Sequence, residues 1–271
     1  MPPPPEEAAR PAVVFKIEMV VGEHTLEASA RVPDGMMRLA DLLPILQAFD
    51  DAVVGVAADK VERAGRAISC RAGCGACCRQ LVPISEAEAV HLAELVEAMP
   101  GQRRAALRGR FDQTLGALAA QGLLARLRRP AAFKTLAARR RIGKEYFQLG
   151  LPCPFLEEES CGVHPHRPLA CREYLVTSAA ENCRHPGPDT IEKVPLPMKF
   201  SEILYTFGDG FGAQATRWLP LVLAPEWAAR RARRQPVFPG PQLFSNFLAL
   251  VSQAAKQAQV QRGVPPDLPK E

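Results

Sequence analysis

Eight cysteines divide into two blocks, and this grouping is the feature of the sequence that could support chemistry. The first block places four cysteines within nine residues, and the second follows after a long stretch that contains none. Thiols that serve as ordinary small core residues would be scattered, so the grouping favours metal ligation or redox chemistry. The candidate ligands are Cys70, Cys74, Cys77 and Cys78 in the first block and Cys153, Cys161, Cys171 and Cys183 in the second.

The first block has the spacing of a metal-binding turn. Thiolates bind Zn²⁺ or iron when several of them converge, and a Cys-x-x-Cys turn such as Cys74 to Cys77 achieves this locally. Gly73 and Gly75 would let the backbone fold close to an ion. If the run were helical instead, its four sulfurs would still share one face. The adjacent Cys77 and Cys78 are expected to point away from each other, so that one of them serves a different site or is a buried thiol.

The identity of the metal is left open by the ligand types. A Zn²⁺ site or a [4Fe–4S] cluster takes four protein ligands, so eight cysteines could fill two sites, or one site with spare thiols. An all-cysteine set favours an iron–sulfur cluster, whereas neighbouring histidines keep Zn²⁺ open. For each of His164, His166 and His185, a polar loop role is favoured over ligation. The predicted cofactor is therefore an iron–sulfur cluster or Zn²⁺.

Three motifs occur in a fixed order: Cys-x3-Cys-x2-Cys-Cys from Cys70, Cys-Pro-Phe-Leu from Cys153, and Arg-Pro-x-x-Cys-Arg ending at Arg172. Together they resemble the YkgJ-type cysteine-cluster family, whose members are described as zinc- or iron-chelating. The flagellin lysine N-methylases carry a similar cluster. The resemblance extends over roughly Cys70 to Cys183 and implies that the cysteines chelate the metal. At His164 the sequence departs from the family, because relatives often have tyrosine there.

The chain is long enough to bury a hydrophobic core, and we recognise no targeting signal in its sequence. The first ten residues are rich in proline and glutamate and lack the pattern of a signal peptide. Apolar runs are too short to cross a bilayer, so no membrane partner is expected. These features favour a cytoplasmic protein, and in that reducing compartment grouped cysteines bind metal or do redox chemistry more often than they form disulfides.

A basic stretch separates the two cysteine blocks. Residues 101–145 contain twelve Lys or Arg but only two acids, Asp112 and Glu145. We favour a solvated, arginine-rich outer face of alanine- and leucine-rich helices over a surface for an anionic partner. Nucleic acid is an unlikely ligand because no aromatic residues are interleaved for base stacking. A partner protein or small molecule is left unspecified.

The fold predicted around the cysteines is mainly α, a helical domain with a small N-terminal β-hairpin and a cysteine-rich, metal-binding loop centre. Period-two patterning predicts the hairpin over residues 15–32, and helical spacing from Leu39 to Arg63 follows it, with a distortion at Pro44. A capping box at residues 85–88 starts a further helix. The predicted divisions are a disordered leader at 1–11, a hairpin and helix at 12–64, the cysteine-cluster domain at 65–190, a packed C-terminal helical extension at 191–259 and a tail at 260–271.

Several expectations concern how the blocks are positioned. Helices within 85–149, interrupted at Gly122 and Pro130, should fold back and bring the second block against the first. The two arginines near Cys171, Arg167 and Arg172, should neutralise thiolates and bind loop carbonyls. The three glutamates of residues 157–159 read as a solvated loop tip. The glycines of residues 208–212 follow an apolar run, 203–207, that would be a strand in a nucleotide- or S-adenosylmethionine-binding loop, but a simple turn is favoured.

Three functions from different classes follow. The first is a protein whose thiolates hold an iron–sulfur cluster or zinc. The second, which rests on the family resemblance, is an enzyme similar to protein-lysine N-methyltransferases with a supporting cluster. The third is a structural zinc module that presents helices for protein interaction. No nucleophile–base pair or paired carboxylate site stands out in the sequence, so catalytic residues are not predicted.

Overall fold

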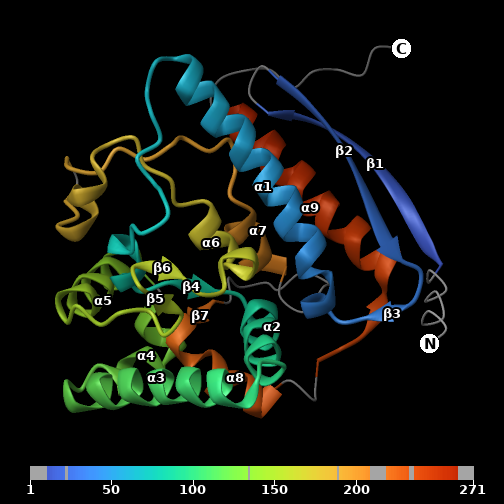
Figure 1. Ribbon diagram of the computed structural model, residues 1–271. Coiled ribbons are helices and arrows are strands. Elements are labelled where there is room, and N and C mark those ends of the chain that lie inside the picture. The colour runs from blue at the N-terminus through green and yellow to red at the C-terminus, as the bar shows by residue number, and fades with distance from the viewer. Residues whose placement is uncertain are drawn as a thin grey trace, which may run out of the picture.

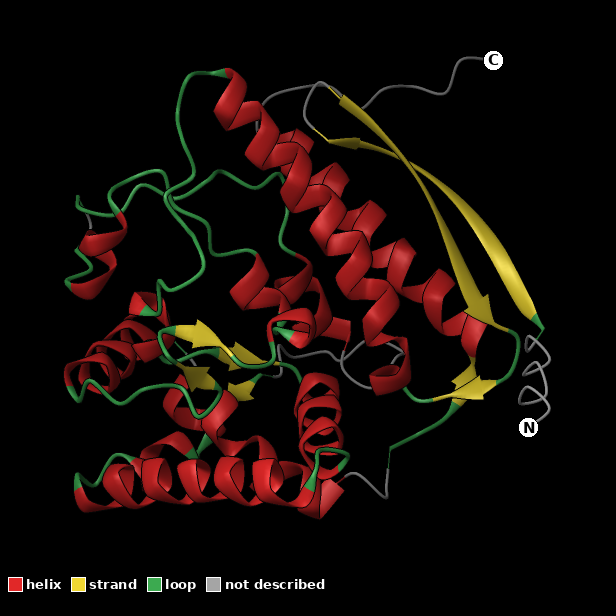
Figure 2. Ribbon diagram, in the orientation of Figure 1, coloured by secondary structure: helices red, strands yellow, loops and turns green. Residues whose placement is uncertain are grey.

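The computed structural model describes residues 11–21, 24–133, 135–187, 189–207, 218–231 and 235–261. Within them the fold is mainly α with an N-terminal hairpin, as predicted (Figures 1 and 2). The helices are α1 (Leu39–Arg63), α2 (Glu86–Glu97), α3 (Gly101–Ala120), α4 (Leu124–Leu127), α5 (Leu136–Gln148), α6 (Leu169–Arg172), α7 (Phe200–Phe207), α8 (Ala224–Arg231) and α9 (Gly240–Gln261). Short 3-10 turns are η1 (Ala76–Arg79), η2 (Pro130–Phe133), η3 (His164–His166), η4 (Ala180–Arg184) and η5 (Leu221–Leu223).

The strands form small antiparallel pairs, and no parallel sheet occurs in the described ranges. The longest pair is the predicted hairpin, in which Ala12 lies opposite Pro33 and Val21 opposite His24. The other pairs join residues that are distant in sequence or close a tight turn. The strands are β1 (Ala12–Val21), β2 (His24–Pro33), β3 (Met36–Met37), β4 (Pro83–Ile84), β5 (Leu156–Glu157), β6 (Ser160–Cys161), β7 (Leu219–Pro220) and β8 (Phe238–Pro239).

One core lies between the hairpin and the two long helices. The hairpin covers α1 and α9 along one side of the molecule (Figure 1). Its inward face carries alternate apolar residues, among them Phe15, Ile17 and the buried Val32, and they pack on residues of α1, α7 and α9. The alternation in the sequence therefore reports a sheet with one face on the core.

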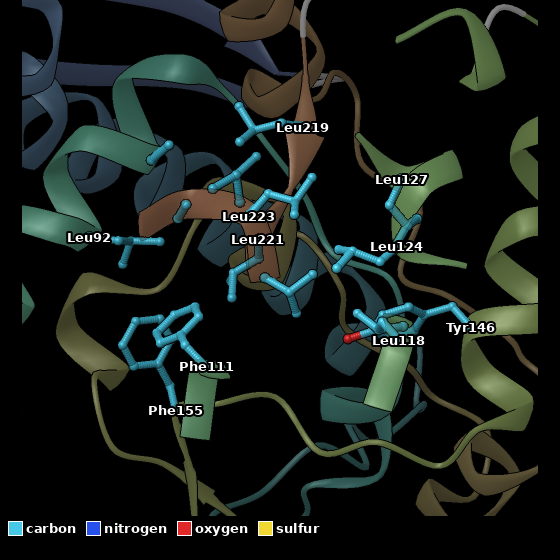
Figure 3. Packing of buried hydrophobic residues seen from close by; sticks show 14 of the residues in the cluster. Leu92, Phe111, Leu118, Leu124, Leu127, Tyr146, Phe155, Leu219, Leu221 and Leu223 are labelled. Atoms are coloured by element: carbon cyan, nitrogen blue, oxygen red, sulfur yellow. The ribbon is translucent and has the colours of Figure 1, made fainter. Parts of the chain in front are cut away.

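A second core lies under α2, α3, α4 and α5. Leucines from these helices meet Phe111, Phe155 and Tyr146, and the chain around η5 crosses the centre of the cluster (Figure 3). The cysteines Cys153 and Cys161 pack against its edge. The second cysteine block is thus attached to a rigid hydrophobic base rather than to solvent-exposed loop alone.

The helix boundaries next to the first cysteine block follow the predicted signals. Helix α1 stops at Arg63, and Gly65 has a φ of +78°, a left-handed conformation that suits glycine at a helix end. Helix α2 begins with the expected capping box, in which Ser85 Oγ accepts from Glu88 N at 3.1 Å and Ser85 N donates to the Glu88 carboxylate at 2.7 Å. The cysteine run is therefore held between two capped helices.

Residues 203–207 belong to α7, so the disfavoured alternative of a strand leading into a cofactor loop does not hold. Phe200, Leu204 and Phe207 are buried in the core with residues of α1 and α9, whereas Glu202 and Thr206, four positions apart, form the exposed face of the helix. The glycine run of residues 208–212 lies outside the described residues. The predicted domain divisions remain predictions, although α1 packs directly on α2 and α6 across the first of them.

Candidate metal centre

The two cysteine blocks meet. The backbone amide of Cys153 donates to the carbonyl of Cys78 at 2.7 Å, and Gly73 N donates to Ser160 Oγ at 3.0 Å. These contacts join residues that are more than seventy positions apart, and they confirm that the intervening helices fold back. A single compact centre can therefore draw ligands from both blocks.

A charged clamp holds the blocks together at the first of these contacts. Arg79 donates to both carboxylate oxygens of Glu159, at 2.6 and 3.0 Å, and to the carbonyl of Gly75 at 2.8 Å. Glu158 and Glu159 have φ values of +49° and +57°, which is the conformation of a tight two-residue hairpin turn between β5 and β6. The expectation of a merely solvated loop tip is wrong for Glu159, because its carboxylate bridges the two blocks.

The close approach of the β5–β6 turn to the first block explains why residue 75 is a glycine. A Cβ atom on Gly75 would lie 2.7 Å from Glu159 Oε2 and 2.8 Å from Leu156 Cδ1, which is shorter than atoms tolerate. The glycine therefore lets the β5–β6 turn lie directly against the first block. Without a side chain at Gly75, Glu159 can approach the first block closely enough to accept from Arg79.

The first block itself is a turn followed by η1. Ser69 N donates to Val176 O, which fixes its entry, and Cys78 N donates to Gly75 O at 3.0 Å as η1 begins. The prediction that Cys77 and Cys78 point away from each other, so that one of them serves a different site or is a buried thiol, stays a prediction.

The second block is tied down by buried polar groups. Arg172 is buried on α6; its Nε donates to Arg167 O at 2.8 Å, and its other nitrogens bind Pro165 O and the Asp51 carboxylate. Gln47 Nε2 also donates to Arg167 O, at 3.2 Å. The predicted role of Arg172 in binding loop carbonyls is confirmed. The loop before Cys171 is thereby fixed to α1.

Burial favours the neutral form of the thiols. Desolvation raises the pKa of Cys70, Cys161, Cys171 and Cys183, and it raises the pKa of Cys153 to about 12. A hydrogen bond to Cys78 and burial together raise the pKa of Cys77. These thiols would bind a metal as thiolates, so binding would release their protons.

Arg167 is the cation that the protein supplies to this centre. Its guanidinium partly opposes the rise in pKa that burial causes for thiols in both blocks, Cys70 and Cys77 in the first and Cys161 and Cys171 in the second. Its Nε is buried and has no hydrogen-bond partner. A buried donor without an acceptor is costly, so this atom marks a place where an anionic acceptor, such as a thiolate or cluster sulfide, would fit.

The three histidines of the second block differ in their surroundings. His166 Nδ1 lies 3.4 Å from Nε2 of His91 on α2, which makes it a hydrogen-bond partner of that ring. His164 and His185 are exposed. The hydrogen-bonding role favoured for these side chains is therefore seen for His166.

The thiols of the two blocks lie in one region, but they are not arranged around a common point that an ion could occupy. Among the described residues, no three His, Cys, Asp or Glu side chains converge in a way that could hold a metal. The residues fit a metal centre by donor type, burial and the orphaned Arg167 donor, while ligation requires the thiols to turn inward. The ligand roles of the eight cysteines therefore remain predictions.

Three acids beside the centre are buried, and two of them, Asp50 and Glu173, gave no sequence signal. Asp50 on α1 is 1% exposed, its Oδ2 has no hydrogen-bond partner, and burial raises its pKa to about 9. Glu173 accepts from Ser201 N at 2.7 Å, and burial raises its pKa to about 7. Glu88 uses one carboxylate oxygen in the capping box of α2 and the other to accept from Leu169 N at 2.8 Å. Glu88 and Glu173 thus connect α2 and α7 to α6, the helix that carries Cys171.

Comparison with known proteins identifies this part of the chain. Residues 69–187 match the family model CxxCxxCC, described as "Putative zinc- or iron-chelating domain". Searches of curated proteins and of solved structures gave no match. None of the helices in the described ranges has the length and apolar character needed to cross a membrane. The matched residues include all eight cysteines, Arg167, Arg172 and the Arg79–Glu159 clamp, so the match covers the whole candidate metal centre.

Proposed function

We propose that this protein is a metal-binding protein whose cysteine thiolates hold an iron–sulfur cluster or zinc. The observation that carries the proposal is the hydrogen bond from Cys153 N to Cys78 O, because it places two cysteine blocks against each other. The zinc- or iron-chelating description of the matched family supports metal binding in general. The ligands would come from the eight cysteines, Cys70 to Cys183.

An iron–sulfur cluster is favoured over zinc by the surroundings of the thiols. The gathered donors are all sulfur, and His166 is engaged with His91 rather than with a thiol. Cluster sulfides and thiolates accept hydrogen bonds, and Arg167 Nε offers a buried N–H without a partner. The arginine would also offset part of the negative charge of a four-thiolate site. When bound, such a cluster supplies one-electron chemistry or a rigid cross-link.

The protein's own residues do three things for that centre. Arg79 and Glu159 lock the two blocks in register, Arg172 fixes the backbone before Cys171, and Arg167 presents charge to thiols of both blocks. Because the ligand-bearing segments are mostly turns and short strands, we expect the metal to contribute strongly to their stability.

The test is elemental analysis of protein purified without oxygen, together with its absorption spectrum and its acid-labile sulfide content. We expect iron with sulfide and a broad brown absorbance. Colourless protein with stoichiometric zinc would replace the iron–sulfur assignment by the zinc assignment. Protein that contains neither metal, and that binds neither on reconstitution, would refute the proposed function.

A further inference from the structure

The eight cysteines do not pack as one group. Cys70, Cys74 and the buried Cys183 pack together in a small apolar cluster around Ala76 and Val176. Cys153 and Cys161 instead pack at the edge of the large core, which contains Phe155. The two groups therefore have separate walls.

The neighbours that affect the pKa of each thiol follow the same division. Burial raises the pKa of Cys183, and the neighbouring Cys77, Cys70 and Cys74 raise it further. Burial likewise raises the pKa of Cys171, and Cys153, Cys77 and Cys161 raise it further. Cys171 thus joins the second group, and Cys77 is close to both.

The adjacent cysteines of η1 lie between the groups. On one side η1 packs against η4, which carries Cys183. On the other side the carbonyl of Cys78 accepts from Cys153 N. Cys77 and Cys78 are successive residues of η1, which therefore contacts both groups and can supply one thiol to each.

We propose that the thiols form two neighbouring four-thiolate sites rather than one centre with spare cysteines. The first site is Cys70, Cys74 and Cys183, the second is Cys153, Cys161 and Cys171, and Cys77 and Cys78 each complete one of them. This inference rests on the proposed function and adds the number of sites to it.

The charge distribution fits two sites. Zn²⁺ with four thiolates carries a net charge of about −2, and so does an oxidised [4Fe–4S] cluster with its four ligands, so two adjacent sites need a shared cation. Arg167 interacts with Cys70 of the first site and with Cys161 of the second. Lys193 provides a further cation on the side of the first site, where its Nζ lies 4.7 Å from the ring centroid of Tyr174, which packs beside Cys183.

The test uses Co²⁺ as the probe, titrated without oxygen into the full-length protein after removal of its metal. Tetrathiolate Co²⁺ has intense charge-transfer and ligand-field absorption, so its equivalents can be counted. We expect two equivalents for the wild-type chain. We expect one equivalent for Cys70→Ser/Cys183→Ser, and one for the matched Cys153→Ser/Cys171→Ser, each with a tetrathiolate spectrum.

A wild-type endpoint of one equivalent would overturn the two-site proposal while leaving the proposed function intact, as would a double variant that retains both equivalents. Wild-type protein that forms no tetrathiolate complex would instead refute the proposed function itself. Should a double variant fail to fold, the wild-type protein still decides: about eight iron and eight sulfide per chain support two [4Fe–4S] clusters, and about four of each contradict them.

Discussion

Replacing Asp50 by asparagine should stabilise the protein, and the gain should increase with pH. The side chain is 1% exposed, and its Oδ2 has no hydrogen-bond partner. Burial, then the nearby Glu173 and Asp51, raise its pKa from 3.8 to about 9, although Arg172 opposes the shift. An amide of the same shape keeps the packing and removes the need to hold a proton.

The sign and size of the effect follow from proton binding. The unfolded chain releases the Asp50 proton near its ordinary pKa, whereas the folded protein holds it up to about pH 9. Between these values the folded state binds more protons, so rising pH lowers the free energy of unfolding. At about 1.4 kcal/mol per pKa unit, the cost is at most about 2 kcal/mol at pH 5 and about 6 kcal/mol at pH 8. Relaxation and water entry reduce both figures.

Urea unfolding of Asp50→Asn and wild type at pH 5 and pH 8 measures this difference. The matched control is Asp59→Asn on the same helix, where the side chain is exposed and the free energy of unfolding should change by less than about 0.5 kcal/mol. An Asp50→Asn protein that is no more stable than wild type at pH 8, or whose gain is equal at both pH values, would refute the reasoning.

Three further predictions concern the segments around the cysteines. Gly75→Ala should lower the free energy of unfolding by about 1–3 kcal/mol and speed metal loss to a chelator, because the added Cβ would overlap Glu159. The control is Gly109→Ala on α3, which has open space around it and should be neutral or stabilising. Equal melting curves for the two variants would contradict this prediction. Arg172→Met should cost about 1–3 kcal/mol, because the carbonyls of Arg167 and Pro165 lose their donor. The exposed Arg141→Met should cost less than about 0.5 kcal/mol, and similar urea midpoints for the two variants would contradict the anchoring role. Removing the metal should increase amide hydrogen exchange in both cysteine blocks and leave α1 and α9 protected; uniform exchange across the chain would refute the local coupling.

Local signals in the sequence predicted the elements that hold the centre. The capping box at Ser85 and Glu88, the glycine after α1, and the alternation of the hairpin each depend on neighbours in the chain, and each appears in the structure. The contact between the two cysteine blocks was also predictable, because grouped cysteines indicate metal ligation, and a shared metal centre requires its ligands to lie close together.

Other features depend on contacts that no local pattern encodes. Glu159 reads as a solvated residue until Arg79, eighty positions earlier, is brought beside it. Asp50 is a polar residue on a long helix, and the sequence around it does not show that α2 and α6 pack against that helix. Residues 203–207 are too short a run to distinguish a helix from a strand, because the exposed face of α7 becomes visible only when Glu202 is read together with Thr206.

The measurement that tests the central claim most directly compares wild-type protein with the Cys74→Ser/Cys77→Ser variant, both purified without oxygen. Iron, zinc and acid-labile sulfide are quantified in the same samples whose thermal unfolding is recorded. We predict that the variant loses metal and melts at a lower temperature, because Cys77 interacts with thiols of both blocks and Cys74 belongs to the turn that presents it. A variant with the full metal content and the wild-type melting temperature would contradict the claim that these cysteines form the organising metal centre.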